Sequence, residues 1–187
     1  MRSPWLMMIG VLSASSLPAQ ATVIQPEVPL DSARAALRDA VLVLRDSLIT
    51  VDGAAARLQR DFRQTSGESL LSRARMMRDA CVRSAHTISP TKETLLAAQL
   101  SEPPRVKRRR ELVNALDRLR GVLRRCEVDF AAMSQPGEAE TVRGYSYARS
   151  QVVQGALRRY EESLRAFLTA MGIYISPAGS GTRAASG

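Results

Sequence analysis

The sequence predicts an all-α fold, an antiparallel up-down-up-down four-helix bundle, on three observations. Apolar residues recur at alternating spacings of three and four over four long segments, which places them on one face of each helix. Clusters of proline, glycine and small polar residues separate the segments, as expected for turns. Both cysteines, Cys81 and Cys126, fall on apolar faces. We therefore expect coiled-coil-like helices over residues 31–175.

The first helix is predicted to begin after Pro29, with Asp31 as its N-cap. Its apolar face comprises Ala33, Leu37, Val41, Leu44, Leu48, Val51, Ala55, Leu58 and Phe62. A second helix is predicted to follow, because Thr65 and Glu68 have the spacing of a capping box. Its apolar face comprises Leu70, Ala74, Met77, Cys81, Ser84 and Ile88.

Pro90 interrupts the second segment and leaves two arrangements open. The helix either ends at Ile88 before a loose linker, or runs over 67–100 with a kink at Pro90. The apolar face resumes after the proline at Leu95, Leu96 and Leu100, which favours the kinked helix.

The cysteines also favour the kinked helix. If it pairs antiparallel with a third helix over 105–134, the turn centres between Pro103 and Pro104, and Cys81 then lies level with Cys126. In an exported protein such a pair is expected to form a disulfide. We therefore predict a Cys81–Cys126 disulfide that closes this hairpin.

The third and fourth segments complete the bundle. The third has a regular apolar face of Leu112, Leu116, Leu119, Leu123, Cys126, Phe130 and Met133. Pro136 and Gly137 end it. The apolar face of the fourth is assigned to Val142, Tyr145, Val152, Ala156, Tyr160, Leu164, Phe167, Met171 and Tyr174. Gly144 and Gly155 inside this helix suggest a close neighbour or a local bend.

The start of the chain indicates export. Residues 1–21 combine a basic start at Arg2, an apolar stretch and small residues at Ala19 and Ala21, the pattern of a cleaved signal peptide. That stretch, about 13 residues, is shorter than the ~20 that span a bilayer. We expect a periplasmic or extracellular protein without a transmembrane span, with an extended segment at 22–30 and a disordered tail at 176–187.

The chain is basic, with 27 Lys and Arg residues against 18 Asp and Glu. A dense run begins the third helix: Arg105, Lys107, Arg108, Arg109 and Arg110. Positive charge at a helix N-terminus opposes the macrodipole, so we expect this tip to serve binding rather than stability. Export excludes nucleic acid, which leaves an anionic envelope component or an acidic protein as partner. The alternative is a solvated run, since 25 of the 27 basic residues are Arg.

Catalytic and cofactor chemistry is not indicated. His86 is the only histidine and no Cys-x-x-Cys-His occurs, so we expect no metal, no haem, no other cofactor and no enzyme activity. The sequence favours a non-catalytic binding or scaffold protein of the cell envelope. The alternative is an envelope chaperone-like protein that holds unfolded chains. Leu95 and Gln99 match two positions of the Leu-Thr-x-x-Gln motif of one such family, with Leu96 in place of the Thr.

Overall fold

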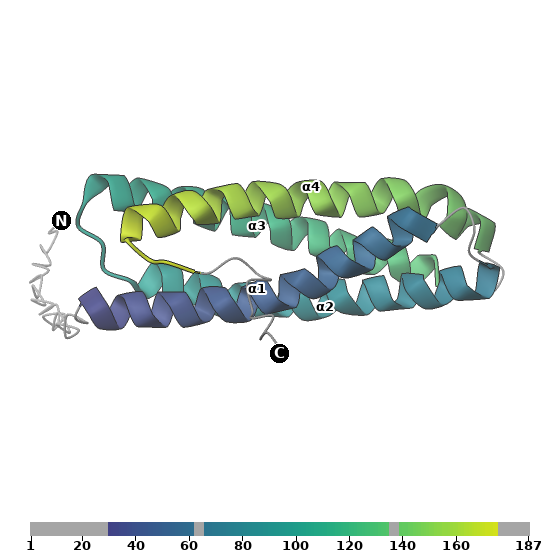
Figure 1. Ribbon diagram of the computed structural model, residues 1–187, viewed down its shortest axis with the longest axis horizontal. Coiled ribbons are helices and arrows are strands. Elements are labelled where there is room, and N and C mark those ends of the chain that lie inside the picture. Colours follow the sequence, from purple (N-terminus) through teal and green to yellow (C-terminus); the bar gives the residue numbers. More distant parts are fainter. Residues whose placement is uncertain (1–29, 62–65, 135–138, 176–187) are drawn as a thin grey trace, which may run out of the picture.

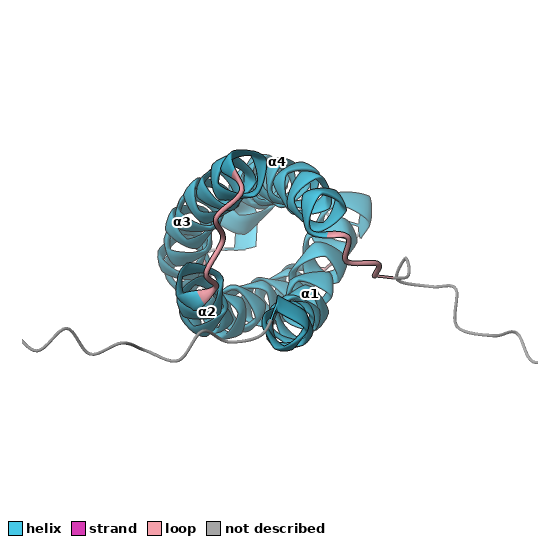
Figure 2. Cartoon of the chain, turned by 90° about the vertical axis from the view of Figure 1, so that its left-hand side faces the viewer, coloured by secondary structure: helices cyan, strands magenta, loops and turns pink. Residues whose placement is uncertain are grey.

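The computed structural model describes residues 30–61, 66–134 and 139–175. Within these ranges the chain forms four α-helices and no strand: α1 (Leu30–Asp61), α2 (Gly67–Ala97), α3 (Pro103–Ala132) and α4 (Ala139–Met171). They lie lengthwise beside one another (Figure 1) and surround a common axis when seen end-on (Figure 2). The predicted all-helical bundle is therefore confirmed. The predicted signal peptide and tail lie outside the described residues.

The helices pack in a closed arrangement. α1 contacts α2 and α4, α3 contacts α2 and α4, and α2 also touches α4. None of the helices in the described ranges is both long enough and apolar enough to cross a membrane.

The apolar faces predicted for the first three helices form the core. Every position assigned to them is buried, apart from Leu96 and Leu100 after Pro90 and from Phe62, which lies outside the described residues. The largest buried side chains include Leu44 and Leu58 of α1, Met77 of α2 and Phe130 of α3. Burying a side chain of this size contributes about 1.5–3 kcal/mol, so these faces supply much of the driving force for folding.

Three predicted helix boundaries were wrong by one or two residues. α1 begins at Leu30, before the assigned cap Asp31. Ser66, not Thr65, is the N-cap of α2, and its Oγ accepts a hydrogen bond from the Ser69 N–H at 3.4 Å. α3 begins at Pro103 rather than Arg105, because proline lacks the N–H that a first helical turn leaves unpaired.

Pro90 lies inside α2, which continues to Ala97. Proline has no N–H to donate to the carbonyl four residues earlier. The next residue, Thr91, is buried and has its hydroxyl 3.0 Å from the Thr87 carbonyl and 3.3 Å from the Ala40 carbonyl of α1. Beyond it Leu95 is buried, but Leu96 is exposed, so the prediction that Leu96 joins the apolar face was wrong.

The assignment of α4 was correct only in its second half. Tyr145, Val152 and Tyr174 are exposed, although all three were assigned to the apolar face. The buried face instead follows one uninterrupted alternation of three and four: Ser146, Ser150, Val153, Leu157, Tyr160, Leu164, Phe167 and Met171. The first two positions of this face are serines. They face the core because helix geometry, not side-chain hydrophobicity, decides which positions point inward.

The glycines of α4 have no steric explanation in the fold. A Cβ added at Gly144 or Gly155 would meet nothing within 4 Å. The suggestion that they permit a close neighbour is therefore wrong for the described part of the chain.

Candidate functional site

The two cysteines join α2 to α3. Their sulfur atoms lie 2.06 Å apart, at disulfide distance, and both residues are fully buried. Polar contacts accompany this cross-link along the same pair of helices. The Lys92 ammonium lies 2.7 Å from the Asp117 carboxylate, and the Arg75 guanidinium donates to the Ser134 carbonyl at 3.5 Å.

α3 is the basic helix of the molecule. It contains nine basic and four acidic residues, a net charge of +5. α1 has five of each and is neutral. More than half of the net charge of +9 thus lies on one helix. An anionic partner would therefore be attracted to the side of the bundle that α3 forms.

Two residues of the predicted tip stabilise neighbouring helices, contrary to expectation. The tip lies at the end of the bundle where α2 turns into α3 (Figure 2). There the Arg105 guanidinium donates to the Ala170 carbonyl at 3.1 Å, and that of Arg109 donates to the Ala98 carbonyl at 2.6 Å. These carbonyls lie at the C-terminal ends of α4 and α2, where positive charge is favourable.

The tip residues also differ in their ion pairs. Arg108 forms an ion pair with Glu111 at 2.8 Å, and Arg105 forms one with Glu102 at 2.9 Å. Lys107 and Arg110 are exposed and have no partner among the residues that the structure describes. The five predicted residues therefore lie together, but within the described ranges only Lys107 and Arg110 present charge to solvent without a partner.

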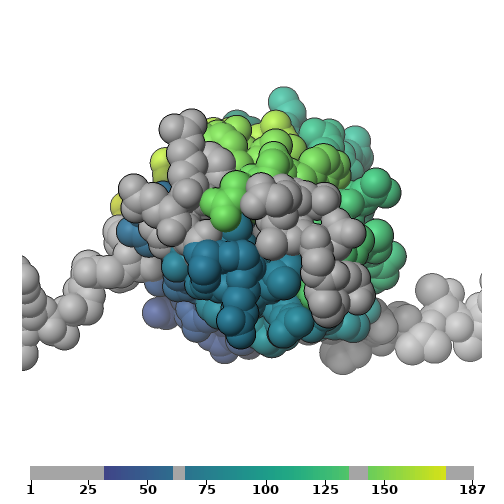
Figure 3. Space-filling model, turned by 90° about the vertical axis from the view of Figure 1, so that its right-hand side faces the viewer, coloured from purple at the N-terminus to yellow at the C-terminus, as the bar shows by residue number. Residues whose placement is uncertain are grey.

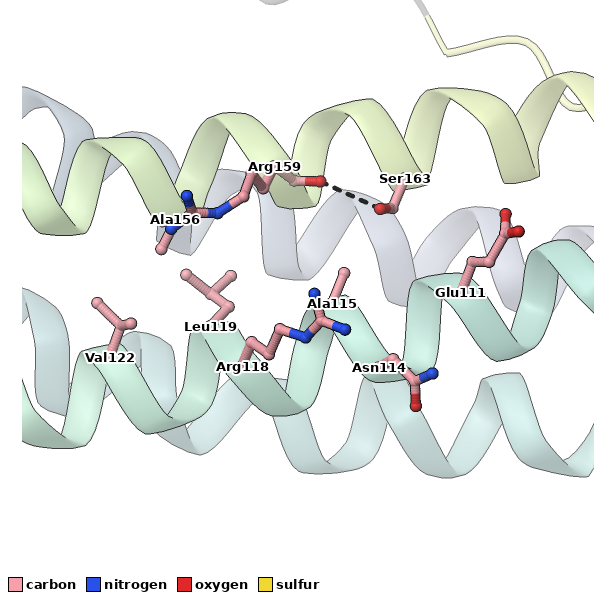
Figure 4. Close-up of a pocket in the computed structure, with 9 residues that line it drawn as sticks. All are labelled: Glu111, Asn114, Ala115, Arg118, Leu119, Val122, Ala156, Arg159 and Ser163. Atoms are coloured by element: carbon pink, nitrogen blue, oxygen red, sulfur yellow. Dashed lines mark hydrogen bonds between the residues drawn. The ribbon is translucent and has the colours of Figure 1, made fainter.

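A groove runs between α3 and α4, and no sequence signal identified it. It has a volume of about 500 Å³ and is lined by Glu111, Asn114, Ala115, Arg118, Leu119, Val122, Ala156, Arg159 and Ser163. Figure 4 shows the lining residues on the facing sides of the two helices. The buried Leu119 and Ala156 form part of its floor. The sequence does contain one weak signal of the groove. At the groove each helix has small side chains where its neighbouring turns have large ones.

Polar contacts hold α3 and α4 together at the two ends of this groove. At one end Arg105 reaches the Ala170 carbonyl. At the other end the Arg149 guanidinium lies 2.5 Å from the Asp129 carboxylate, and it also lies over the Tyr145 ring. Between these contacts, no ion pair or side-chain hydrogen bond joins the two helices within the described ranges.

Other candidate sites offer little chemistry. His86 is exposed and lies inside α2. No group of three or more His, Cys, Asp or Glu that could hold a metal occurs among the described residues. Burial raises the pKa of Tyr160 well above its usual value, and the charge of Glu161 adds to this. Tyr160 therefore stays neutral in the core at ordinary pH.

The end of the bundle opposite the tip is formed in part by the start of α2 (Figure 3). Exposed large apolar side chains are found there and elsewhere, on all four helices: Val43, Ile49, Met76, Leu96, Val128, Tyr145, Tyr147 and Val152. Such scattered exposure is ordinary for a protein surface. It offers no specific support to the chaperone-like alternative.

No protein-family model, curated protein or solved structure matches this chain.

Proposed function

We propose that the protein is an exported, non-catalytic binding or scaffold protein of the cell envelope that uses the basic tip of α3 to bind an anionic partner. The observation that carries this proposal is the exposure of Lys107 and Arg110 without a partner among the described residues. Arg105 and Arg109 contact neighbouring helix ends beside them. The free charges are therefore presented from an ordered surface, which lowers the entropy lost on binding.

Two features support export. Residues 1–21 have the pattern of a signal peptide. Cys81 and Cys126 lie at disulfide distance, and disulfides persist mainly in oxidising compartments. An exported protein does not meet chromosomal DNA, so the expected partner is a phospholipid headgroup, an anionic polysaccharide or an acidic protein surface.

We further infer that the four helices follow an up-down-up-down topology with antiparallel neighbours and that α2 bends at Pro90. Contacts between α2 and α3 pair rising residue numbers with falling ones: Arg75 with Ser134, Cys81 with Cys126, Lys92 with Asp117, and Ala98 with Arg109. Ser84 contacts Ser47 and Thr91 contacts Ala40 in the same sense between α2 and α1. The bend rests on the missing Pro90 N–H.

Removing the two free charges tests the tip. The variant Lys107→Gln with Arg110→Gln should bind vesicles that contain phosphatidylglycerol ~10-fold more weakly than wild type at ~0.15 M salt, because two electrostatic contacts are lost. The matched control is Arg83→Gln with Arg158→Gln, which removes equal charge from exposed residues on other helices. Vesicle co-sedimentation measures both.

The control distinguishes the loss of the tip residues from the loss of total charge. It should lose less than about twofold in affinity, since long-range attraction is screened beyond ~8 Å at physiological salt. Equal losses in the two variants would mean that total charge, not the tip, governs binding. The proposal would then be abandoned in favour of a solvated run.

A further inference from the structure

We propose that the groove between α3 and α4 is a second binding site, separate from the tip, and that it takes an acidic amphipathic segment of a partner protein. The apolar side chains of that segment would pack on the groove floor, and its carboxylates would pair with Arg118 and Arg159. None of the tip residues lines this site.

Small side chains keep the groove open. Ala115 of α3 and Ala156 of α4 line different parts of the groove, with Ala156 opposite Leu119 and Val122, and a longer side chain at either position would take up space in it (Figure 4). Polar contacts tie the two helices together beyond each end, from Arg105 to Ala170 and from Arg149 to Asp129. Both ends of the groove are therefore flanked by polar contacts between the helices, while its middle is accessible.

The charge on the groove is unbalanced. Arg118 and Arg159 are exposed, and neither guanidinium has an ion-pair or hydrogen-bond partner in the described part of the chain. The one acid that lines the groove, Glu111, already pairs with Arg108. Guanidinium groups bind carboxylates in a fork geometry, so two unpaired arginines beside an apolar floor complement an acidic, amphipathic ligand.

Gly121 follows Arg118 by almost one turn of α3. A Cβ added there would meet nothing within 4 Å, so the fold does not require a glycine. A glycine inside a helix costs about 1 kcal/mol relative to alanine. The missing side chain leaves open space on α3 one turn from Arg118, where the backbone of a partner would have room to approach.

The dimensions favour a peptide over other anions. From Glu111 to Val122 the groove follows about three turns of α3, or ~16 Å at 1.5 Å per residue. That length matches one face of a short amphipathic helix laid in a groove, a common recognition mode. An acyl chain would need an enclosed apolar tunnel, and single-stranded nucleic acid would need aromatic stacking, but no aromatic residue lines the groove.

Fluorescence anisotropy with a defined probe tests the proposal. The probe is a fluorescein-labelled peptide of four Glu-Leu-Ala-Glu repeats, titrated with the full protein. The variant Arg118→Gln with Arg159→Gln should weaken binding at least ~10-fold, the loss expected when two charge-assisted contacts are removed. The control Arg124→Gln with Arg158→Gln removes the same charge from the same two helices outside the groove.

A steric variant gives an independent readout. Gly121→Phe keeps every charge, and its side chain would project beside the groove into open space, so it should weaken peptide binding without unfolding the protein. Circular dichroism checks the fold. The equivalent change at Gly144 also meets open space but lies away from the groove, so it should leave binding unchanged.

Each outcome decides between the two sites. Loss of binding in the Arg118 and Arg159 variant with retention in its control supports the groove. Equal loss in both, or no detectable binding by wild type, overturns it. Loss in the Lys107 and Arg110 variant would assign the peptide to the tip instead and would also overturn the groove. Vesicle binding by the tip is measured separately, so either proposal can fail while the other stands.

Discussion

α3 meets its two main neighbours in different ways. Against α2 it forms a seam that is cross-linked by Cys81 and Cys126 and reinforced by an ion pair from Asp117 to Lys92. Against α4 it forms a seam in which the polar contacts among the described residues lie only at its ends, with an open groove between them. Leu119, one of the buried leucines of α3, forms part of the groove floor.

The difference shows how one helix can be held in place within the bundle and still expose a surface for binding. The cross-link to α2 restrains the position of α3 without help from the middle of the α4 seam. That middle can therefore keep small residues such as Ala115 and Ala156, at the expense of packing energy that larger side chains would supply. One side of α3 is cross-linked, and the other side packs against α4 but leaves a groove open.

Breaking the α2 seam should have the largest effect. Replacing Cys81 and Cys126 by Ala should lower the free energy of unfolding by about 4 kcal/mol, because the disulfide closes a loop with a sequence separation of 45 and so restricts the unfolded chain. Urea denaturation followed by circular dichroism measures the change. A loss below about 1 kcal/mol would mean that packing alone holds this seam.

Removing the two arginine caps tests one contact on each seam. Arg109 contacts the Ala98 carbonyl at the α2 end, and Arg105 contacts the Ala170 carbonyl at the α4 end. Replacing both by Gln should lower the free energy of unfolding by ~1 kcal/mol, since each charge favours a helix C-terminus. Thermal denaturation measures it. The comparison variant Lys107→Gln with Arg110→Gln should not lose stability, and equal melting temperatures would refute the capping role.

The smallest expected effect is a gain. Gly121→Ala should raise the free energy of unfolding by about 0.5–1 kcal/mol, because the methyl group enters open space and the unfolded chain loses freedom. Gly172→Ala is the comparison variant and should lower the free energy of unfolding, because Gly172 has a φ of +66° that strains an alanine. Chemical denaturation should give opposite signs for the two variants. A loss at Gly121 would show that α3 needs a glycine there for its own fold.

The cores of α1, α2 and α3 could be predicted from the sequence because periodicity and side-chain chemistry agree in them. The predicted positions are large and apolar, such as Leu44, Met77 and Leu116, and all three are buried. The meeting of Cys81 and Cys126 followed from the same regularity. When two helices keep a strict repeat on either side of a turn, residues at equal distance from that turn lie level with each other.

The start of α4 could not be predicted in this way because chemistry and position disagree there. Tyr145 and Val152 were assigned to the apolar face because of their large side chains, yet Ser146 and Ser150 face the core. The Ser150 hydroxyl donates to the Tyr147 carbonyl of its own helix at 2.8 Å, so this buried polar group is satisfied locally. The rotation of α4 is set by its second half, where Phe167 and Met171 are fully buried.

What the sequence by itself determined is the helical class, the order of the helices and the core faces of the first three, because these depend on spacing along one chain. Only the tertiary structure decided which arginines are free. Arg109 and Arg110 are adjacent in sequence, but one caps α2 and the other is exposed without a partner among the described residues. The groove likewise belongs to two helices at once. The partners of a side chain and the cavities of a fold depend on segments that are distant in sequence, so local periodicity does not predict them.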